Sequence, residues 1–157
     1  SQETPNGPSL KCRDGNWRIK PTNKIIDLSV LIESRVLCVF FDPSTPFRII
    51  GTLKEIWGLS YASNNMDSAG RPIISRACKP LLNHKHAWQG GDCPLPEGFM
   101  VKVWLRSGIS SMCNHIKDHN KATNLRWSHG NHSADIIAFE VLGLADGHAM
   151  PWEQDNG

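Results

Sequence analysis

The sequence predicts a mainly β fold, and it also permits a β-rich α+β fold. Short apolar blocks rich in Val, Ile, Phe and Trp are separated by clusters of Pro, Gly, Asn, Asp and Ser, a pattern typical of antiparallel hairpins. The blocks are residues 25–32, 36–41, 47–56, 100–105 and 136–142. We therefore expect hairpins that share one sheet or face each other in a small sandwich.

Residues 99–106 show the clearest two-residue alternation. One face of this predicted strand carries Met100, Lys102, Trp104 and Arg106, and the other carries Val101, Val103 and Leu105. Such alternation indicates a half-buried strand with Trp104 on its more polar face. Residues 23–33 and 135–144 also fit a helix, but their β-branched content favours strand.

A weak internal similarity links residues 36–51 with residues 100–129. In both segments a strand is followed by a return strand that begins with an apolar-Arg-apolar triplet, Phe47-Arg48-Ile49 and Leu125-Arg126-Trp127. The pattern permits a duplicated β unit, with a long polar loop between Gly108 and Thr123 in the second copy.

The length of 157 residues fits one ordinary domain. Residues 1–16 are polar and contain Pro and Gly, so we expect a flexible N-terminal lead-in. Residues 17–145 then form a single β-rich domain, and residues 146–157 form a C-terminal tail.

Charge and cysteine content limit the classes of function that the sequence suggests. The net charge of +2, with basic residues spread along the chain, does not indicate binding to duplex DNA, although it does not exclude nucleic acid. The five cysteines never occur as CxxC, and no secretory signal pattern begins the sequence. Both observations favour reduced thiols in a cytoplasm. The longest apolar stretch, residues 36–41, is too short to span a membrane.

Two segments carry a resemblance to known sequences. Residues 90–98 read GGDCPLPEG, and the later Trp127-Ser128-His129 precedes Asp135-Ile136-Ile137-Ala138-Phe139. Together they resemble a module of small bacteriophage and prophage proteins, in which GG(D/E)CP(L/V)P(D/E)G is followed by WxH and DIIA(F/Y)xV. The resemblance covers residues 88–142. It implies a viral origin and a location in the host bacterial cytoplasm, but it brings no established activity.

Residues 113–132 show a weaker likeness to an HNH nuclease core. On that interpretation His115 is the base that activates water, Asn124 orients it, and His132 binds a divalent metal such as magnesium. Three features depart from the pattern, of which the first is that Asn114, rather than an acidic residue or His, precedes His115. Asn124 follows His115 by only nine positions, and residues 136–141 resemble a strand where the HNH core has a helix.

A zinc site is a second alternative. His84 and His86, or Cys113 and His115, would share a strand face because they are two residues apart, and Cys93 could add a thiolate. No pair has the two-residue spacing of a zinc knuckle. Surface histidines and buried structural cysteines explain the same residues equally well.

A third set combines aromatic rings and cations, and it is our candidate ligand or partner site. Tryptophan and arginine can stack a base and hold a phosphate, and they also dominate protein interface hot spots. The set consists of Trp88, Trp104, Arg106, Arg126, Trp127 and His129.

From these patterns we expect a phage-encoded binding protein rather than an enzyme, with no cofactor and no membrane contact. Its partner would be a host or defence protein that it caps and inhibits, or a nucleotide-like ligand that it sequesters. The alternatives are the metal-dependent HNH-like nuclease and a structural, virion-associated protein.

Overall fold

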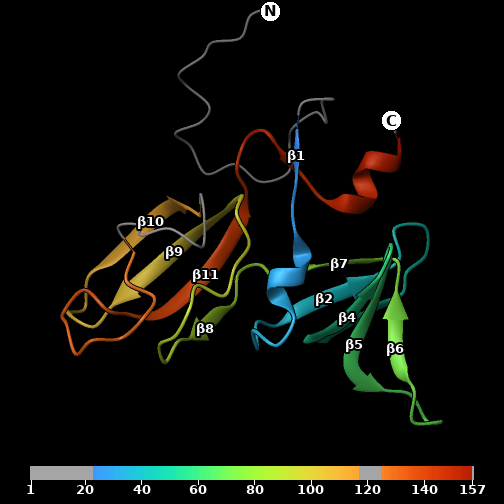
Figure 1. Cartoon of the computed structure of the whole chain (residues 1–157), viewed down its shortest axis with the longest axis horizontal. Helices are drawn as coiled ribbons and strands as arrows, with labels where there is room; N and C mark the ends of the chain where they lie inside the picture. Colours follow the sequence, from blue (N-terminus) through green and yellow to red (C-terminus); the bar gives the residue numbers. More distant parts are fainter. Residues whose placement is uncertain (1–22, 117–124, 157) are drawn as a thin grey trace, which may run out of the picture.

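The computed structural model describes residues 23–116 and 125–156, and these residues form a mainly β protein, as the sequence predicts. Two groups of strands lie side by side, with β1 and the short helix η2 between them (Figure 1). The only elements that are not strands among the described residues are the 3-10 helices η2 (Leu28–Leu31) and η3 (Pro151–Asn156).

The first group contains two three-stranded antiparallel sheets. One has the order β3-β2-β7 and the other has the order β4-β5-β6. The strands are β2 (Cys38–Phe41), β3 (Arg48–Gly51), β4 (Leu53–Trp57), β5 (Ser60–Met66), β6 (Pro72–Ser75) and β7 (Ala77–Pro80).

The apolar block at residues 47–56 divides into β3 and β4, which belong to different sheets. At this corner the amide of Asn65 donates a hydrogen bond to the carbonyl of Ile50 at 3.0 Å. A Cβ on Gly51 would come within 3.0 Å of the same amide, so the glycine leaves room for the chain to change sheets here.

The second group is one four-stranded antiparallel sheet with the order β10-β9-β11-β8. Its strands are β8 (Lys85–Ala87), β9 (Phe99–Leu105), β10 (Ser110–His115) and β11 (Ile136–Leu144). The predicted alternation in β9 is confirmed, because Val101 and Val103 are fully buried whereas Lys102 and Trp104 are only partly covered.

Three expectations are corrected by the structure. Leu28–Leu31 is a 3-10 helix instead of a strand, because the carboxylate of Asp27 accepts a hydrogen bond from the N–H of Ser29 and caps it. Ser110–His115 is strand β10 instead of loop, since β9 pairs with it along its free edge. Residues 125–129 are not the return strand of β9, so the two hairpins are not equivalent units.

Strands β1 and β12 and the helix η3 join the two groups. Strand β1 (Lys24–Ile25) pairs in parallel with β12 (His148–Ala149), and Trp152 of η3 contacts the rings of Phe41 and Tyr61 edge to face. Within the segment that the sequence assigns to a tail, Trp152 therefore packs against the first group. The predicted lead-in at residues 1–16 lies outside the described residues.

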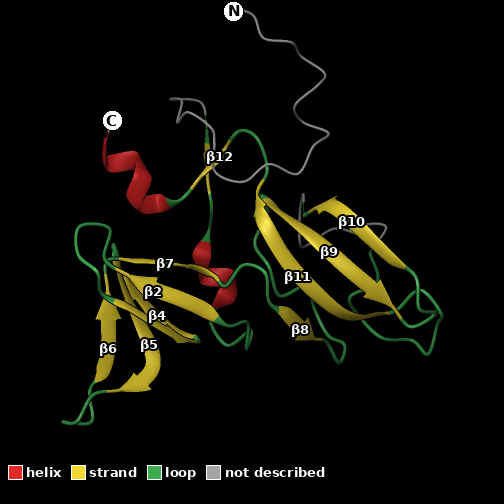
Figure 2. Ribbon diagram, turned by 180° about the vertical axis from the view of Figure 1, so that it is seen from behind, coloured by secondary structure: helices red, strands yellow, loops and turns green. Residues whose placement is uncertain are grey.

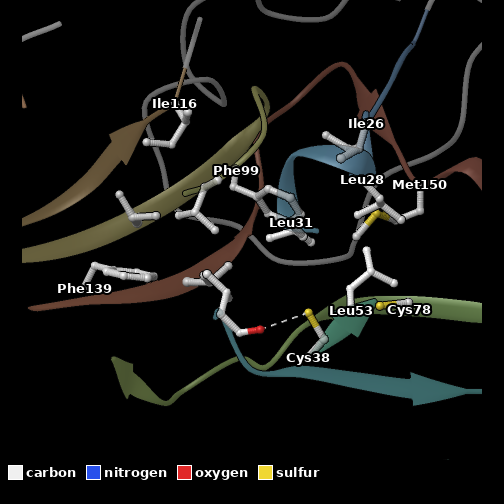
Figure 3. Packing of buried hydrophobic residues seen from close by; sticks show 14 of the residues in the cluster. Ile26, Leu28, Leu31, Cys38, Leu53, Cys78, Phe99, Ile116, Phe139 and Met150 are labelled. Carbon is white, nitrogen blue, oxygen red and sulfur yellow. Dashed lines mark hydrogen bonds between the residues drawn. The ribbon is translucent and has the colours of Figure 1, made fainter. Parts of the chain in front are cut away.

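One hydrophobic cluster spans both groups, and Figure 3 shows part of it. Side chains from η2 meet side chains from β2, β9 and β11. The labelled members in that view are Ile26, Leu28, Leu31, Cys38, Leu53, Cys78, Phe99, Ile116, Phe139 and Met150.

Candidate functional site

Two of the candidate tryptophans belong to the core. Trp127 is 6% exposed, and Trp88 packs on it edge to face with ring centroids 5.6 Å apart. Both rings also contact Phe139 of β11. The indole N–H of Trp88 donates to the main-chain carbonyl of Trp127 at 2.6 Å. This pair therefore fixes the segment around Trp127 against the sheet.

The two candidate arginines bind one buried carboxylate. Asp135 is 0% exposed, and its oxygens lie 3.2 Å from Nη2 of Arg106 and 3.3 Å from Nε of Arg126. The N–H groups of Gly130 and His132 donate to the same carboxylate at 3.0 and 2.9 Å. We call this arrangement the Asp135 clamp, with Asp135, Arg106, Arg126, Gly130 and His132 as its members.

The clamp keeps Asp135 ionised. Burial by itself raises the pKa of the carboxyl, but the hydrogen bonds from His132 and Gly130 and the two guanidinium groups outweigh it. The pKa of Asp135 is therefore held well below its ordinary value. The arginines neutralise this buried charge, and each uses one nitrogen for it, Nη2 of Arg106 and Nε of Arg126.

The structure also brings residues 127–136 into contact with Gly90 of the GGDCPLPEG segment. His129 contacts the carbonyl of Ile136 through Nε2 at 2.6 Å, and its ring lies under Gly90. A Cβ on Gly90, which has φ of 102°, would come within 3.0 Å of that ring. At the other end of the first segment Gly98 has φ of 110°, and a Cβ there would collide with Ile26 and His148. The glycines thus allow close packing.

Trp104 has a different environment, on the outer face of the four-stranded sheet. The ammonium groups of Lys85 and Lys102 lie 4.3 and 4.8 Å from the centroid of its ring. Ala138 is directly opposite Trp104 on β11 and is 6% exposed, so the small residue leaves room for the indole. Glu140 is opposite both Lys85 and Lys102 in register, but neither lysine forms an ion pair with it.

Exposed apolar side chains also occur on and before the neighbouring strand. Met112 on β10 is 60% exposed, and Ile109 just before that strand is 63% exposed. We call Trp104, Lys85 and Lys102 the Trp104 face.

The six predicted residues thus do not form one pocket. Trp88, Trp127 and His129 lie together at the inner side of the sheet, Arg106 and Arg126 form the Asp135 clamp, and Trp104 stands apart on the outer face. The candidate set omits Lys85 and Lys102. Position 102 shares a face with position 104 by alternation, so Lys102 was detectable from the sequence, whereas Lys85 reaches Trp104 only through the strand order.

The residues of the HNH-like alternative lie in different parts of the structure. His115 is on β10, and His132 lies in an exposed loop, where its Nδ1 accepts a hydrogen bond from the N–H of Ala134. Asn124 lies outside the described residues. Ile136–Leu144 forms strand β11, so the helix that an HNH core places after its hairpin is not found at this position.

The residues of the zinc alternative are engaged elsewhere. The rings of His84 and His86 meet edge to face at 4.6 Å, and Nε2 of His86 accepts a hydrogen bond from the N–H of Leu37 at 3.2 Å. Burial lowers the pKa of His86 and raises the pKa of the Cys93 thiol to about 11. Within residues 23–116 and 125–156, no group of three or more His, Cys, Asp or Glu is arranged to hold a metal ion, and the side chain of Cys113 is not among those described.

A cleft lies where the two strand groups meet. Its volume is about 870 Å³, and it is lined by residues 30, 32–37, 84–94 and Phe139. The first half of the motif, Gly90 to Pro94, forms part of its wall.

Comparison of this chain with protein families, with curated proteins and with solved structures finds no match. Among the described residues no helix has the length and apolar character needed to cross a membrane.

Proposed function

We propose that this chain is a phage-encoded, non-enzymatic binding protein that caps a host or defence protein in the bacterial cytoplasm. The observation that supports this most is the environment of Trp104. Trp104 is a half-covered indole that carries two ammonium groups, and tryptophan is among the residues enriched in protein interface hot spots.

A protein partner fits better than a nucleotide-like ligand. Stacking a base and holding a phosphate requires an aromatic face next to free guanidinium donors. Arg106 and Arg126 donate to Asp135, while Trp88 and Trp127 pack on each other. The two rings that would stack a base, Trp88 and Trp127, thus hold the fold, while each guanidinium group keeps donors that Asp135 does not use.

The chemistry of the Trp104 face also defines the partner. Lys85 and Lys102 both place their charge on the indole rather than on Glu140. An incoming carboxylate would pair with these ammonium groups while apolar side chains cover the ring of Trp104. We therefore expect an acidic segment flanked by apolar residues on the partner.

The test is affinity capture from bacterial lysate with the tagged protein, with and without nuclease treatment, followed by mass spectrometry. We expect one stoichiometric protein that survives nuclease and is lost with Trp104→Ala. Trp57→Ala is the matched control, because Trp57 is 50% exposed on the other strand group and its indole N–H donates only to Glu55.

The outcomes separate the assignments. Capture by wild type and by Trp57→Ala, but not by Trp104→Ala, supports the proposal. Equal capture by all three proteins would place recognition elsewhere. Retention of nothing, or only of material that disappears with nucleic acid, would reject a protein-capping function.

A further inference from the structure

Strand β8 is the edge strand of the four-stranded sheet, and it lies at the border between the two strand groups (Figure 2). It pairs only with β11. An edge strand presents main-chain N–H and C=O groups that can pair with another chain. The question is therefore what faces the free side of β8.

The direction of the main-chain groups follows from the pairing with β11. The N–H of Trp88 donates to the carbonyl of Ile137 at 2.9 Å. Hydrogen-bonded positions alternate along an antiparallel pair, so His86 and Trp88 turn their main-chain groups toward β11, while Lys85 and Ala87 turn theirs away. Among the described residues no hydrogen bond reaches the main chain of Lys85 or Ala87.

The free side of β8 borders the cleft. Side chains of successive strand residues point to opposite faces of a sheet, yet Lys85, His86 and Ala87 all line the cleft. These three residues share the main chain at the free edge of β8, so this edge forms one wall of the cleft.

The opposite wall is the segment from Ile32 to Leu37, which leads into β2. Glu33 and Arg35 lie in this wall, both exposed and both in the left-handed region, with φ of 65° and 66°. Neither takes part in an ion pair within the described residues. At the base of the cleft the N–H of Leu37 donates to the ring of His86 and ties the two walls together.

We propose that β8 binds an extended segment of the partner protein as an added fifth strand, with that segment lying in the cleft beside Lys85 and Ala87. This inference rests on the proposed protein-binding function and names the form in which the partner is recognised. Strand addition satisfies the free main-chain groups of the edge. Lys85 connects the two surfaces, since its main chain belongs to the edge and its ammonium group lies on Trp104.

The cleft also favours particular side chains in the added strand. Alternate residues of that strand would point to the side of the sheet where His86 and Trp88 lie, and the others toward solvent. Arg35 at the rim would pair with a carboxylate, in line with the acidic partner expected for the Trp104 face. The segment is therefore one in which apolar and polar residues alternate, with at least one acidic residue.

The first experiment uses an array of synthetic ten-residue peptides that have this alternating pattern. Peptides that bind are resynthesised with a single N-methyl group at each position in turn. Strand addition predicts that methylation weakens binding at least tenfold at every second position and has little effect between them. Binding by no peptide, or a methylation profile without this period of two, would overturn the inference.

The second experiment changes the edge itself. Ala87→Pro removes one outward N–H, and proline is tolerated at edge positions whose N–H does not point to a neighbouring strand. Ala87→Thr is the matched control, because it changes the side chain and keeps the N–H. We expect Ala87→Pro to lose at least tenfold in peptide affinity and Ala87→Thr to bind like the wild type. Equal affinity of the two variants contradicts strand addition.

A measurement on the wild-type protein covers the case in which Ala87→Pro fails to fold. Hydrogen exchange with the best array peptide bound should slow at the amides of Lys85 and Ala87, and those of His86 and Trp88 should change little. Unchanged exchange at Lys85 and Ala87 overturns the inference. A lysate protein that is lost with Trp104→Ala but kept with Ala87→Pro would leave the proposed function intact and reject only the added strand.

Discussion

The Asp135 clamp and the Trp104 face use similar residue types with opposite results. In the clamp two guanidinium groups bind a fully buried carboxylate, and Trp127 beside it is buried against Trp88. On the Trp104 face two ammonium groups lie on a partly exposed ring with no carboxylate bound to them. Residue type alone therefore does not distinguish a structural cluster from a recognition surface. The two regions differ in whether a carboxylate binds their cations.

The largest effect is expected at the aromatic pair beside the clamp. Trp127→Ala leaves a cavity against Trp88 and Phe139, and truncation of a buried tryptophan costs about 3–5 kcal/mol in the free energy of unfolding. Chemical denaturation measures this loss, and Trp127→Phe should recover part of it. A change below about 1 kcal/mol, typical of surface substitutions, would show that Trp127 is not part of the core.

A smaller and pH-dependent effect is expected within the clamp. Asp135→Asn keeps the shape of the side chain but removes its charge, so Arg106 and Arg126 lose their partner. Because the pKa of Asp135 is lowered by folding, its ionised form stabilises the protein above the ordinary aspartate pKa of about 4, and this contribution is lost as the pH falls through the folded-state pKa.

Thermal unfolding across a pH series tests this contribution. We expect Asp135→Asn to unfold at a lower temperature than wild type at pH of about 7, with a gap that narrows as the pH falls below about 4. A gap that stays constant over this range would mean that the charge of Asp135 does not contribute.

The smallest effect on stability is expected on the outer face. Trp104→Ala removes the contacts with Lys85 and Lys102, and cation–π contacts at exposed sites contribute about 0.5–1 kcal/mol. We expect the free energy of unfolding to change by less than about 1 kcal/mol, in contrast to Trp127→Ala. Denaturation of both variants under one condition checks this. Equal losses of unfolding free energy in the two variants would show that Trp104 contributes to stability as much as Trp127 does.

Local pattern was enough to predict part of this molecule. Alternation in residues 99–106 located β9 and the outward position of Trp104, because the side-chain period of a strand is a property of the backbone alone. The apolar pattern predicted a strand at Leu28–Leu31, but these residues form a 3-10 helix that Asp27 caps. It also missed β10, whose polar residues form a strand because the edge of β9 provides main-chain partners.

The candidate site was predicted in composition but not in arrangement. The tryptophans, arginines and His129 were recognised as residues able to bind a partner. These residues were divided by Asp135, which accepts hydrogen bonds from Arg126 nearby and from Arg106 in the turn after β9. The pairing of Trp88 with Trp127 likewise joins residues that are distant in the sequence.

The sequence by itself determined the β class and the two faces of β9, because each depends on the backbone preferences of neighbouring residues. Only the tertiary structure decided which cations are neutralised, which tryptophans are buried, and that β8 lies at an edge beside a cleft. These properties depend on strand order and register, which bring together residues that no local pattern connects.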